Sequence, residues 1–240
     1  MKKLCLLLLL FLSHFLLMPL ETTHAKGKQE PVPDTVADSH SKYTAYFQTN
    51  SGRYCTAILI SSTAALTARH CVGREPAERV GTIYPGQNGD KRPFGYMNIR
   101  TYIPNPNPKY DIAILKGTER DQDEFYKYYI RKFSTTVKGY TDEEFRTFMG
   151  QDAYAYGYPH GKQFRNNVQY RSDGKITSYK TKPIPYLLTD MPAFSGQSGS
   201  GVFKKDGKFL GFMVTRTKKN TANILPFTES IAKWINENAK

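Results

Sequence analysis

Three short stretches of the sequence contain side chains that could carry out covalent chemistry together. "LTARHC" ends an apolar run with His70, "YDIAIL" contains Asp111, and "FSGQSGSGVF" surrounds Ser198 with glycines. A serine hydroxyl is a weak nucleophile until a base takes its proton, and imidazole is the suitable base near neutral pH. A carboxylate can orient the imidazole and stabilise its protonated form. The three residue types therefore suit nucleophilic acyl transfer.

Each stretch also has a simpler interpretation when it is taken alone. The His70–Cys71 pair could be a metal site, half of a disulfide, a catalytic base or a coincidence. Asp111 could be solvated at a strand edge, because a buried carboxylate needs a hydrogen-bond donor. Ser198 could lie in an ordinary turn, although glycines also let backbone N–H groups approach an oxyanion. The hypothesis therefore depends on the three stretches occurring together.

The other histidines and cysteines offer no competing site. His40 lies in a polar segment and His160 in the loop "YPHGK", so both are expected at the surface. Cys5 lies in the predicted signal peptide, and the remaining Cys55 and Cys71 suggest one disulfide in an exported protein. A metal site needs more ligands, and the sequence has no CxxC or HExxH pattern. We therefore expect no metal and no other cofactor.

The order His70, Asp111, Ser198, with the motifs around these residues, resembles the catalytic triad of the chymotrypsin-like serine proteases. The resemblance covers approximately residues 43–240. It implies that His70 is the general base, that Asp111 orients it and that Ser198 is the nucleophile. It also implies an oxyanion hole made by the backbone N–H groups of Gly196 and Ser198. Protein or peptide substrates follow from the same resemblance.

The resemblance extends to the cysteines. In many members of this family, the cysteine after the catalytic histidine, here Cys71, pairs with a cysteine on the preceding strand, where Cys55 stands. Such a bond would join two neighbouring strands and fix the base. In the chain-entropy model, a loop of this length contributes about 3 kcal/mol to stability.

The residue before the nucleophile distinguishes two branches of the family. Animal digestive enzymes carry an aspartate there, which binds the newly cut N-terminus, whereas this chain carries Gln197. Activation through such an ion pair is therefore not expected. The forms "GQSGSG" and "YGYPHGK" and the single C-terminal helix resemble the secreted bacterial branch. That branch contains the glutamyl endopeptidases, the Spl-type proteases and the exfoliative toxins.

The resemblance also places a pocket for the residue before the cleaved bond. Ala193 and Met213 stand where glutamate-specific members carry threonine and histidine, which argues against the usual glutamate pocket. Arg216 stands where exfoliative toxins carry a lysine, and a guanidinium there could bind a carboxylate in bidentate fashion. The alternative is that Arg216 points to water at the pocket rim. Val214 replaces the serine that commonly supports the triad aspartate, which leaves open how Asp111 is held.

Many short apolar segments separated by turns predict an all-β protein. Asp206-Gly207 is a favoured hairpin pair, and residues 228–239 predict a helix with Thr228 as its cap. The resemblance implies two packed six-stranded antiparallel β-barrels followed by this helix, with a boundary near residues 120–150. The expected strands lie in "YTAYFQT", "YCTAILISSTAALTARHC", "YMNIRTYI", "YDIAILKG", "DAYAYGY", "VQYRSDGKITSY", "IPYLLTD", "SGVFKKDGKFLGFMVT" and "ANILPF".

The N-terminal residues predict export. Residues 1–25 combine Lys2 and Lys3 with a long apolar run and a small-residue cleavage site, as a secretion signal does. An uncleaved membrane anchor is the alternative, because the run is nearly long enough to span a bilayer. Residues 26–42 are polar and predict a flexible lead or short propeptide before the peptidase domain, residues 43–240. We expect a secreted extracellular monomer, without stable membrane insertion after signal removal.

The chain is strongly basic. Its formal charge of +13 falls to +12 when Lys2, Lys3 and Glu21 leave with the signal. The basic residues are scattered and no nucleic-acid-binding motif is present, so a nucleic-acid partner is not expected. The sequence predicts a secreted serine endopeptidase with a preference for acidic residues through Arg216. The alternative is a catalytically silent or latent homologue that binds an anionic surface or an acidic partner.

Overall fold

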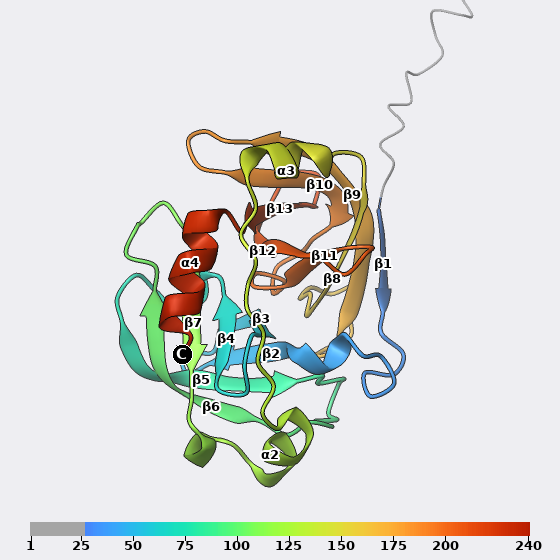
Figure 1. The fold of residues 1–240 in the computed structure, drawn as a ribbon. Coiled ribbons are helices and arrows are strands. Elements are labelled where there is room, and N and C mark those ends of the chain that lie inside the picture. The colour runs from blue at the N-terminus through green and yellow to red at the C-terminus, as the bar shows by residue number, and fades with distance from the viewer. Residues whose placement is uncertain (1–26) are drawn as a thin grey trace, which may run out of the picture.

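The computed structural model describes residues 27–240, which form two β-barrels and a C-terminal helix (Figure 1). The predicted signal peptide lies outside the described residues. The first barrel is closed, with antiparallel strands in the order β2-β3-β4-β7-β6-β5. Its strands are β2 (Thr44–Thr49), β3 (Tyr54–Leu59), β4 (Ala64–Thr67), β5 (Ala77–Pro85), β6 (Met97–Pro104) and β7 (Ala113–Lys116).

The second barrel has the strand order β9-β10-β13-β12-β11-β8, and the pairing of β8 with β9 closes it. The prediction of two six-stranded antiparallel barrels is therefore confirmed. The strands are β8 (Asp152–Gly157), β9 (Tyr170–Lys180), β10 (Tyr186–Pro192), β11 (Gly201–Lys204), β12 (Phe209–Arg216) and β13 (Thr221–Pro226).

Short helical segments connect these strands. The 3₁₀ turns are η1 (Ser41–Tyr43), η2 (Arg69–Cys71) and η3 (Glu119–Asp121). Two helices follow the first barrel in sequence and precede the second. They are α2 (Glu124–Ile130), capped by the Asp123 side chain, and α3 (Asp142–Thr147), which begins with a capping box of Thr141 and Glu144. Within residues 27–240, no helix is long and apolar enough to cross a membrane.

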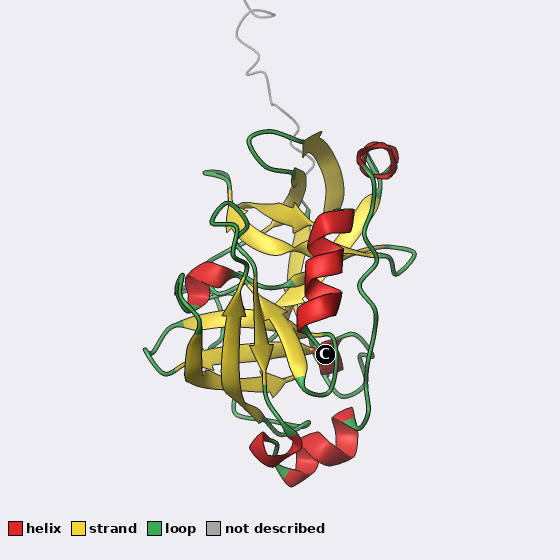
Figure 2. Cartoon of the chain, turned by 60° about the vertical axis from the view of Figure 1, so that its left-hand side comes forward, coloured by secondary structure: helices red, strands yellow, loops and turns green. Residues whose placement is uncertain are grey.

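The predicted C-terminal helix is confirmed as α4 (Glu229–Asn238). Ile231 and Ile235 are buried in a core cluster that also contains many first-barrel side chains. The chain therefore returns from the second barrel to pack its last helix against the first (Figure 2). The Thr228 side chain accepts a hydrogen bond from the Ile231 N–H at 3.4 Å and so begins the helix.

β5 is the one barrel strand that the apolar pattern does not predict. Its pairing with β6 shifts register between Glu78 and Gly81, and Arg79 has a positive φ of 52°. A bulge of this kind interrupts the alternation of buried and exposed side chains on which sequence patterns depend. The burial pattern of the strand therefore alternates only after the bulge, from Gly81 to Pro85.

The described part of the expected flexible lead, residues 27–42, is paired and partly buried. Lys28–Pro31 forms strand β1, which pairs antiparallel with β9 along the outside of the second barrel (Figure 1). Farther along the segment, the buried Thr35 hydroxyl donates to the Gly86 carbonyl of the first barrel at 2.6 Å. Long-range backbone pairing and burial, which the polar composition does not indicate, join this segment to both barrels. Its identity as a propeptide stays a prediction.

Replacing the cap of α4 should weaken the fold. Thr228→Ala is expected to lower the free energy of unfolding by about 1 kcal/mol, because the Ile231 N–H loses its acceptor. Urea unfolding followed by circular dichroism measures the change. Thr228→Ser, which keeps the acceptor oxygen, should stay close to wild type. Equal stability of the alanine variant and the wild type would show that the cap contributes nothing.

Candidate active site

His70 lies in the 3₁₀ turn η2, shortly after β4 ends. Tyr102 of β6, whose side chain is fully buried, restrains this turn through its hydroxyl. The Tyr102 hydroxyl lies 3.0 Å from the Arg69 carbonyl oxygen and 2.7 Å from that of Gly73. The two carbonyls flank the histidine in sequence, so one phenol ties both ends of the turn to the barrel wall.

A disulfide fixes the same turn from the side. Cys71, in η2, is bonded to Cys55 of β3 with an S–S distance of 1.98 Å, in agreement with the expected pairing. The bond links the turn to a strand that precedes it by 16 residues. The turn that carries His70 is therefore restrained by the Cys55–Cys71 disulfide and by the hydrogen bonds of the Tyr102 hydroxyl.

Asp111 lies just before β7 and binds His70 at two points. Its Oδ2 accepts a hydrogen bond from the imidazole Nδ1 at 2.6 Å, and its Oδ1 accepts from the His70 backbone N–H at 2.9 Å. Since an ionised carboxylate can only accept, Nδ1 carries a proton and Nε2 can act as a base. The backbone N–H supplies the second contact, while Val214 is a buried apolar residue on β12.

The environment keeps the Asp111 carboxyl ionised. Burial by itself would raise its pKa, but hydrogen bonds from His70, the charge of His70 and the charge of Arg69 together hold that pKa below its ordinary value. The ionised carboxylate thus stabilises the folded state above the pKa of an unfolded aspartate. This contribution is lost as the pH falls through the lowered pKa.

Ser198 comes from the second barrel, in the turn between β10 and β11. Its Oγ lies 2.9 Å from His70 Nε2, so the structure brings together the three predicted residues from two barrels. Two backbone bonds hold the turn: the Thr56 N–H donates to the Ser198 carbonyl at 2.9 Å, and the Gly199 N–H donates to the Met213 carbonyl at 2.8 Å.

Thr56, fully buried on β3, joins the first barrel to this turn. Its hydroxyl donates to the Gly196 carbonyl at 2.9 Å and accepts from the Tyr158 N–H at 3.0 Å. Gly199 adopts a φ of +95°, and a Cβ there would lie 1.9 Å from the Thr56 carbonyl oxygen. Glycine at this position therefore permits the close approach of the two backbones.

Hydrogen bonds to their carbonyls orient two peptide groups in the Ser198 turn. The Ser195 carbonyl accepts from the His160 N–H at 2.6 Å, and the Gln197 carbonyl accepts from an N–H three residues later at 3.0 Å. In a trans peptide the N–H points away from the carbonyl, so those of Gly196 and Ser198 point the other way. Neither N–H donates a hydrogen bond to another residue within 27–240. They are thus available to an oxyanion.

A pocket of about 160 Å³ opens beside Ser198. The predicted pocket residues Ala193 and Met213 are buried in its wall, while Arg216 is exposed at its rim. The Arg216 guanidinium donates to the Asn220 side-chain oxygen. The lining consists of Ala193, Phe194, Ser195, Gln197, Ser198, Met213, Val214, Thr215 and Arg216.

The two remaining histidines of the described chain lie outside this constellation. His160 is exposed and takes part through its backbone N–H. His40 is half exposed and contacts Tyr154 and Tyr156 on the second barrel. Sequence reasoning missed the structural roles of Tyr102 and Thr56, because no local motif marks a residue whose partners are distant in the sequence.

The chain is similar in sequence to known peptidases. A protein-family model described as a trypsin-like peptidase domain matches residues 55–212, a span that contains His70, Asp111 and Ser198. Among curated proteins, an extracellular metalloprotease of Bacillus subtilis (strain 168) is 25% identical over 169 residues. The matched region is 66% of this chain and 49% of that protein, so the chain spans about half the length of this relative.

Solved structures share the fold. A Glu endopeptidase in complex with MPD matches with a TM-score of 0.70 and 22% identity, covering 88% of this chain and 96% of that chain. The protease Anisep from Arthrobacter nicotinovorans has a TM-score of 0.63 and 16% identity, covering 88% and 99%. The thermostable serine protease AL20 also has a TM-score of 0.63 and 16% identity, covering 83% and 97%. At these identities the likeness establishes the architecture.

The metal that the name of the Bacillus relative implies does not fit the residues beside the triad. Cys55, His70 and Cys71 form the one group of potential metal ligands within residues 27–240, with ligand atoms within 4.8 Å of one another. However, the two sulfurs are bonded to each other, and a metal requires thiolates. The ring nitrogens of the histidine already face Asp111 and Ser198.

Removing the Tyr102 hydroxyl, which binds the turn around His70, should reduce both stability and turnover. Tyr102→Phe leaves two carbonyls without their shared donor, so we expect a loss of about 1 kcal/mol in the free energy of unfolding and a lower kcat for peptide hydrolysis. Tyr126→Phe is the matched control, because the Tyr126 hydroxyl is buried without a hydrogen-bond partner in the described structure. If the two variants behave alike, the Tyr102 hydroxyl does not support the turn.

Proposed function

The chain belongs to the trypsin-like peptidase domain family, and from that premise we propose that it is a secreted serine endopeptidase. The observation that carries the proposal is the continuous hydrogen-bonded chain from Asp111 through His70 to Ser198. Its two links measure 2.6 Å and 2.9 Å. An orienting carboxylate, a base with a free lone pair and a hydroxyl within its reach form the arrangement that activates serine.

In the proposed reaction, Ser198 Oγ attacks the carbonyl carbon of the scissile peptide bond while His70 Nε2 takes the hydroxyl proton. The negative charge that develops on the carbonyl oxygen is stabilised by the N–H groups of Gly196 and Ser198. His70 then gives its proton to the leaving amine, and an acyl-enzyme remains on Ser198. Water, deprotonated by His70, attacks the ester carbonyl, the bond to Ser198 Oγ breaks, and His70 returns the proton to that oxygen as the second product leaves.

The imidazolium that forms during this cycle needs a nearby negative charge. Asp111 supplies it, because the contacts from His70 keep its pKa below the ordinary value and hold the carboxylate in place. Its second oxygen is bound by the His70 backbone, so the carboxylate and the imidazole keep their relative orientation as the proton moves. Asp111 thus acts through His70 and need not touch the substrate.

We further propose that the pocket favours an acidic residue before the cleaved bond. Its wall is formed by the buried side chains of Ala193 and Met213, which leave the Arg216 guanidinium at the rim as its cation. Arg216 contacts the neutral amide of Asn220, and none of the ion pairs between residues 27 and 240 involves it. A substrate carboxylate would gain a charge-assisted hydrogen bond there.

Two observations support an extracellular setting. The Cys55–Cys71 disulfide is of the kind that persists in oxidising compartments. The N-terminal charged and apolar run has the pattern of a secretion signal. The connected triad favours catalysis over the alternative in which the basic chain acts only by binding an anionic surface.

Loss of the nucleophile should abolish activity without unfolding the protein. We expect Ser198→Ala to lower kcat for peptide hydrolysis by about 10⁴-fold or more and to prevent labelling by a fluorophosphonate. Intact-mass measurement should find one adduct on the wild type and none on the variant. Ser51→Ala, which removes an exposed serine from the β2–β3 turn, is the control and should be labelled fully. Labelling of Ser198→Ala would refute the assignment.

The pocket preference can be tested with paired peptides that differ only in glutamate or glutamine before the scissile bond. Arg216→Met should reduce the preference for glutamate in kcat/KM by about tenfold or more, because the carboxylate loses a charge-assisted partner. Lys218→Met removes an equal charge two residues farther on, in the turn between β12 and β13, and should leave the ratio unchanged. A preference that survives Arg216→Met would assign acid recognition to another group.

A further inference from the structure

Gln197, the residue before Ser198, has a side chain whose polar atoms are all engaged. The residue is only 1% exposed. Its Oε1 accepts from the Phe194 N–H at 2.9 Å and from Gln29 Nε2 at 3.0 Å. Its Nε2 donates to Ser172 Oγ at 3.2 Å. Because the Phe194 N–H needs an oxygen opposite it, the amide orientation is determined by the network.

Gln29 reaches this site from the N-terminal strand β1. It stands opposite Ser172 in the β1–β9 ladder, which turns its side chain inward while those of Lys28 and Glu30 are exposed. Gln29 Nε2 uses both hydrogens, one to Ser172 Oγ at 2.7 Å and one to Gln197 Oε1. Three side chains from β1, β9 and the turn before the nucleophile thus close a hydrogen-bonded triangle.

The triangle acts on the turn that carries the oxyanion N–H of Gly196. Gln197 binds Phe194 from both sides, since its backbone N–H donates to the Phe194 carbonyl at 3.2 Å and its Oε1 accepts from the Phe194 N–H. Gly196, with a φ of +90°, lies within the turn that these two contacts close. The position of Gln197 Oε1 therefore influences where the Gly196 N–H points.

We propose that Gln29 is a positioning residue for catalysis, acting through Gln197 to hold the oxyanion turn in its working conformation. This inference rests on the proposed function, because it assigns a role within the same reaction. It makes β1 part of the working enzyme, so cleavage on its C-terminal side would impair the active site. The contact uses an internal side-chain amide and does not require a free α-amino group.

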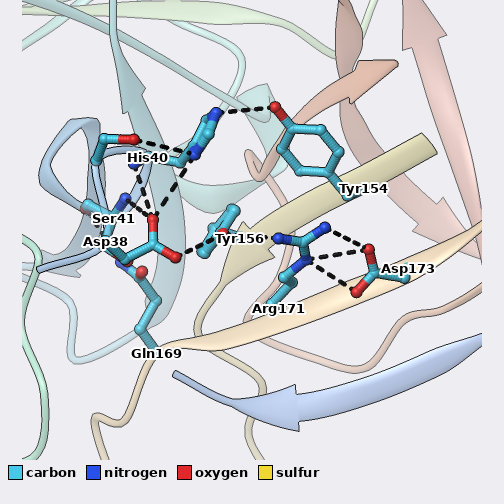
Figure 3. Close-up of polar contacts among 9 residues, drawn as sticks. Asp38, His40, Ser41, Tyr154, Tyr156, Gln169, Arg171 and Asp173 are labelled. Atoms are coloured by element: carbon cyan, nitrogen blue, oxygen red, sulfur yellow. Dashed lines mark hydrogen bonds and ion pairs between the residues drawn. The ribbon is translucent and has the colours of Figure 1, made fainter. Parts of the chain in front are cut away.

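The strand that carries Gln29 is anchored on both sides. Before it, the Gly27 N–H donates to the Asp190 carbonyl at 3.2 Å. After it, a polar cluster holds the chain to β8, as Figure 3 shows: His40 Nε2 lies 2.9 Å from the Tyr154 hydroxyl, and the Tyr156 hydroxyl donates to Asp38 at 2.7 Å.

The same cluster continues into β9, which carries Ser172. The His40 ring stacks on Tyr156 with ring centroids 5.8 Å apart. Arg171 donates to the Tyr156 hydroxyl at 3.2 Å and pairs with Asp173 at 2.7 Å (Figure 3). The segment from residue 27 to residue 41 is therefore tied along β8 and β9, and Gln29 meets Gln197 from a fixed position.

The test compares Gln29→Ala, Gln29→Glu and the control Glu30→Ala. Glu30 lies on the same strand with an exposed side chain paired to Lys28. The isosteric Gln29→Glu keeps the shape but places a carboxylate against the Gln197 oxygen. For each variant we would measure kcat and KM with one peptide, the rate of labelling by a fluorophosphonate and the thermal unfolding midpoint. The phosphonyl oxygen occupies the oxyanion hole during labelling, so that rate reports the hole directly.

We expect Gln29→Ala to lower kcat and the labelling rate by the same factor, about tenfold to a hundredfold, because losing a whole oxyanion donor lowers rates by ~10²–10³. KM should change much less. Gln29→Glu should be at least as impaired, by a factor larger than any fall in its midpoint accounts for, and Glu30→Ala should match wild type in every measurement.

Two results would overturn the inference. One is wild-type kcat and labelling in both Gln29 variants. The other is a loss of kcat and labelling rate that is fully explained by the fraction of unfolded protein at the assay temperature. If Gln29→Ala folds poorly, Gln29→Glu is used to make this comparison. A folded wild-type chain that neither cleaves peptides nor reacts with the fluorophosphonate would instead contradict the proposed function, so the two failures are distinguishable.

Discussion

The hydrogen bond between His70 Nε2 and Ser198 Oγ crosses from one barrel to the other, so the rest of the site depends on how the barrels pack. Thr56 sets that packing at the point nearest the triad. Its N–H, hydroxyl and carbonyl contact the Ser198 carbonyl, the Gly196 carbonyl and the Thr67 hydroxyl, respectively. A single buried residue of β3 thus fixes the serine turn against the first barrel, and Gly199 permits the close approach.

The first barrel holds its half of the site by independent means. The disulfide at Cys71 and the Tyr102 hydroxyl restrain the η2 turn, and Asp111 binds the same residue through its ring and its backbone. The backbone contact explains how the aspartate is held although Val214 offers no hydroxyl. The base and its orienting carboxylate therefore move as one unit, which preserves the tautomer that leaves Nε2 free.

In the second barrel, the turn that carries Ser198 is held partly by the N-terminal strand β1. β1 adds an edge strand beside β9, and Gln29 on this strand is hydrogen-bonded to Gln197, which precedes Ser198. The N-terminal lead thereby contacts the second barrel through β1 and the His40 cluster and the first through Thr35. Its polar composition suits this course, because the chain runs over the surface and buries few apolar side chains.

The sequence by itself determined the class of fold, and it singled out the three residues on which the proposed chemistry depends. The motifs around His70, Asp111 and Ser198 are local, and an alternating apolar pattern marks most of the barrel strands. The pattern does not predict β5, because a bulge interrupts its alternation. It does not predict β1 either, because this short polar edge strand forms only through its pairing with β9. In both segments, the local sequence does not favour a strand, and pairing with a distant strand determines the structure.

Only the tertiary structure decided how His70, Asp111 and Ser198 are held. Gln29 and Gln197 are 168 positions apart, Thr56 and Gly196 are 140 apart, and Tyr102 and Arg69 are 33 apart. A hydrogen bond between such residues depends on strand register and barrel packing, neither of which leaves a pattern in the neighbouring sequence. A short motif can therefore reveal which side chains react, whereas the contacts that aim them exist only once the two barrels have closed and packed.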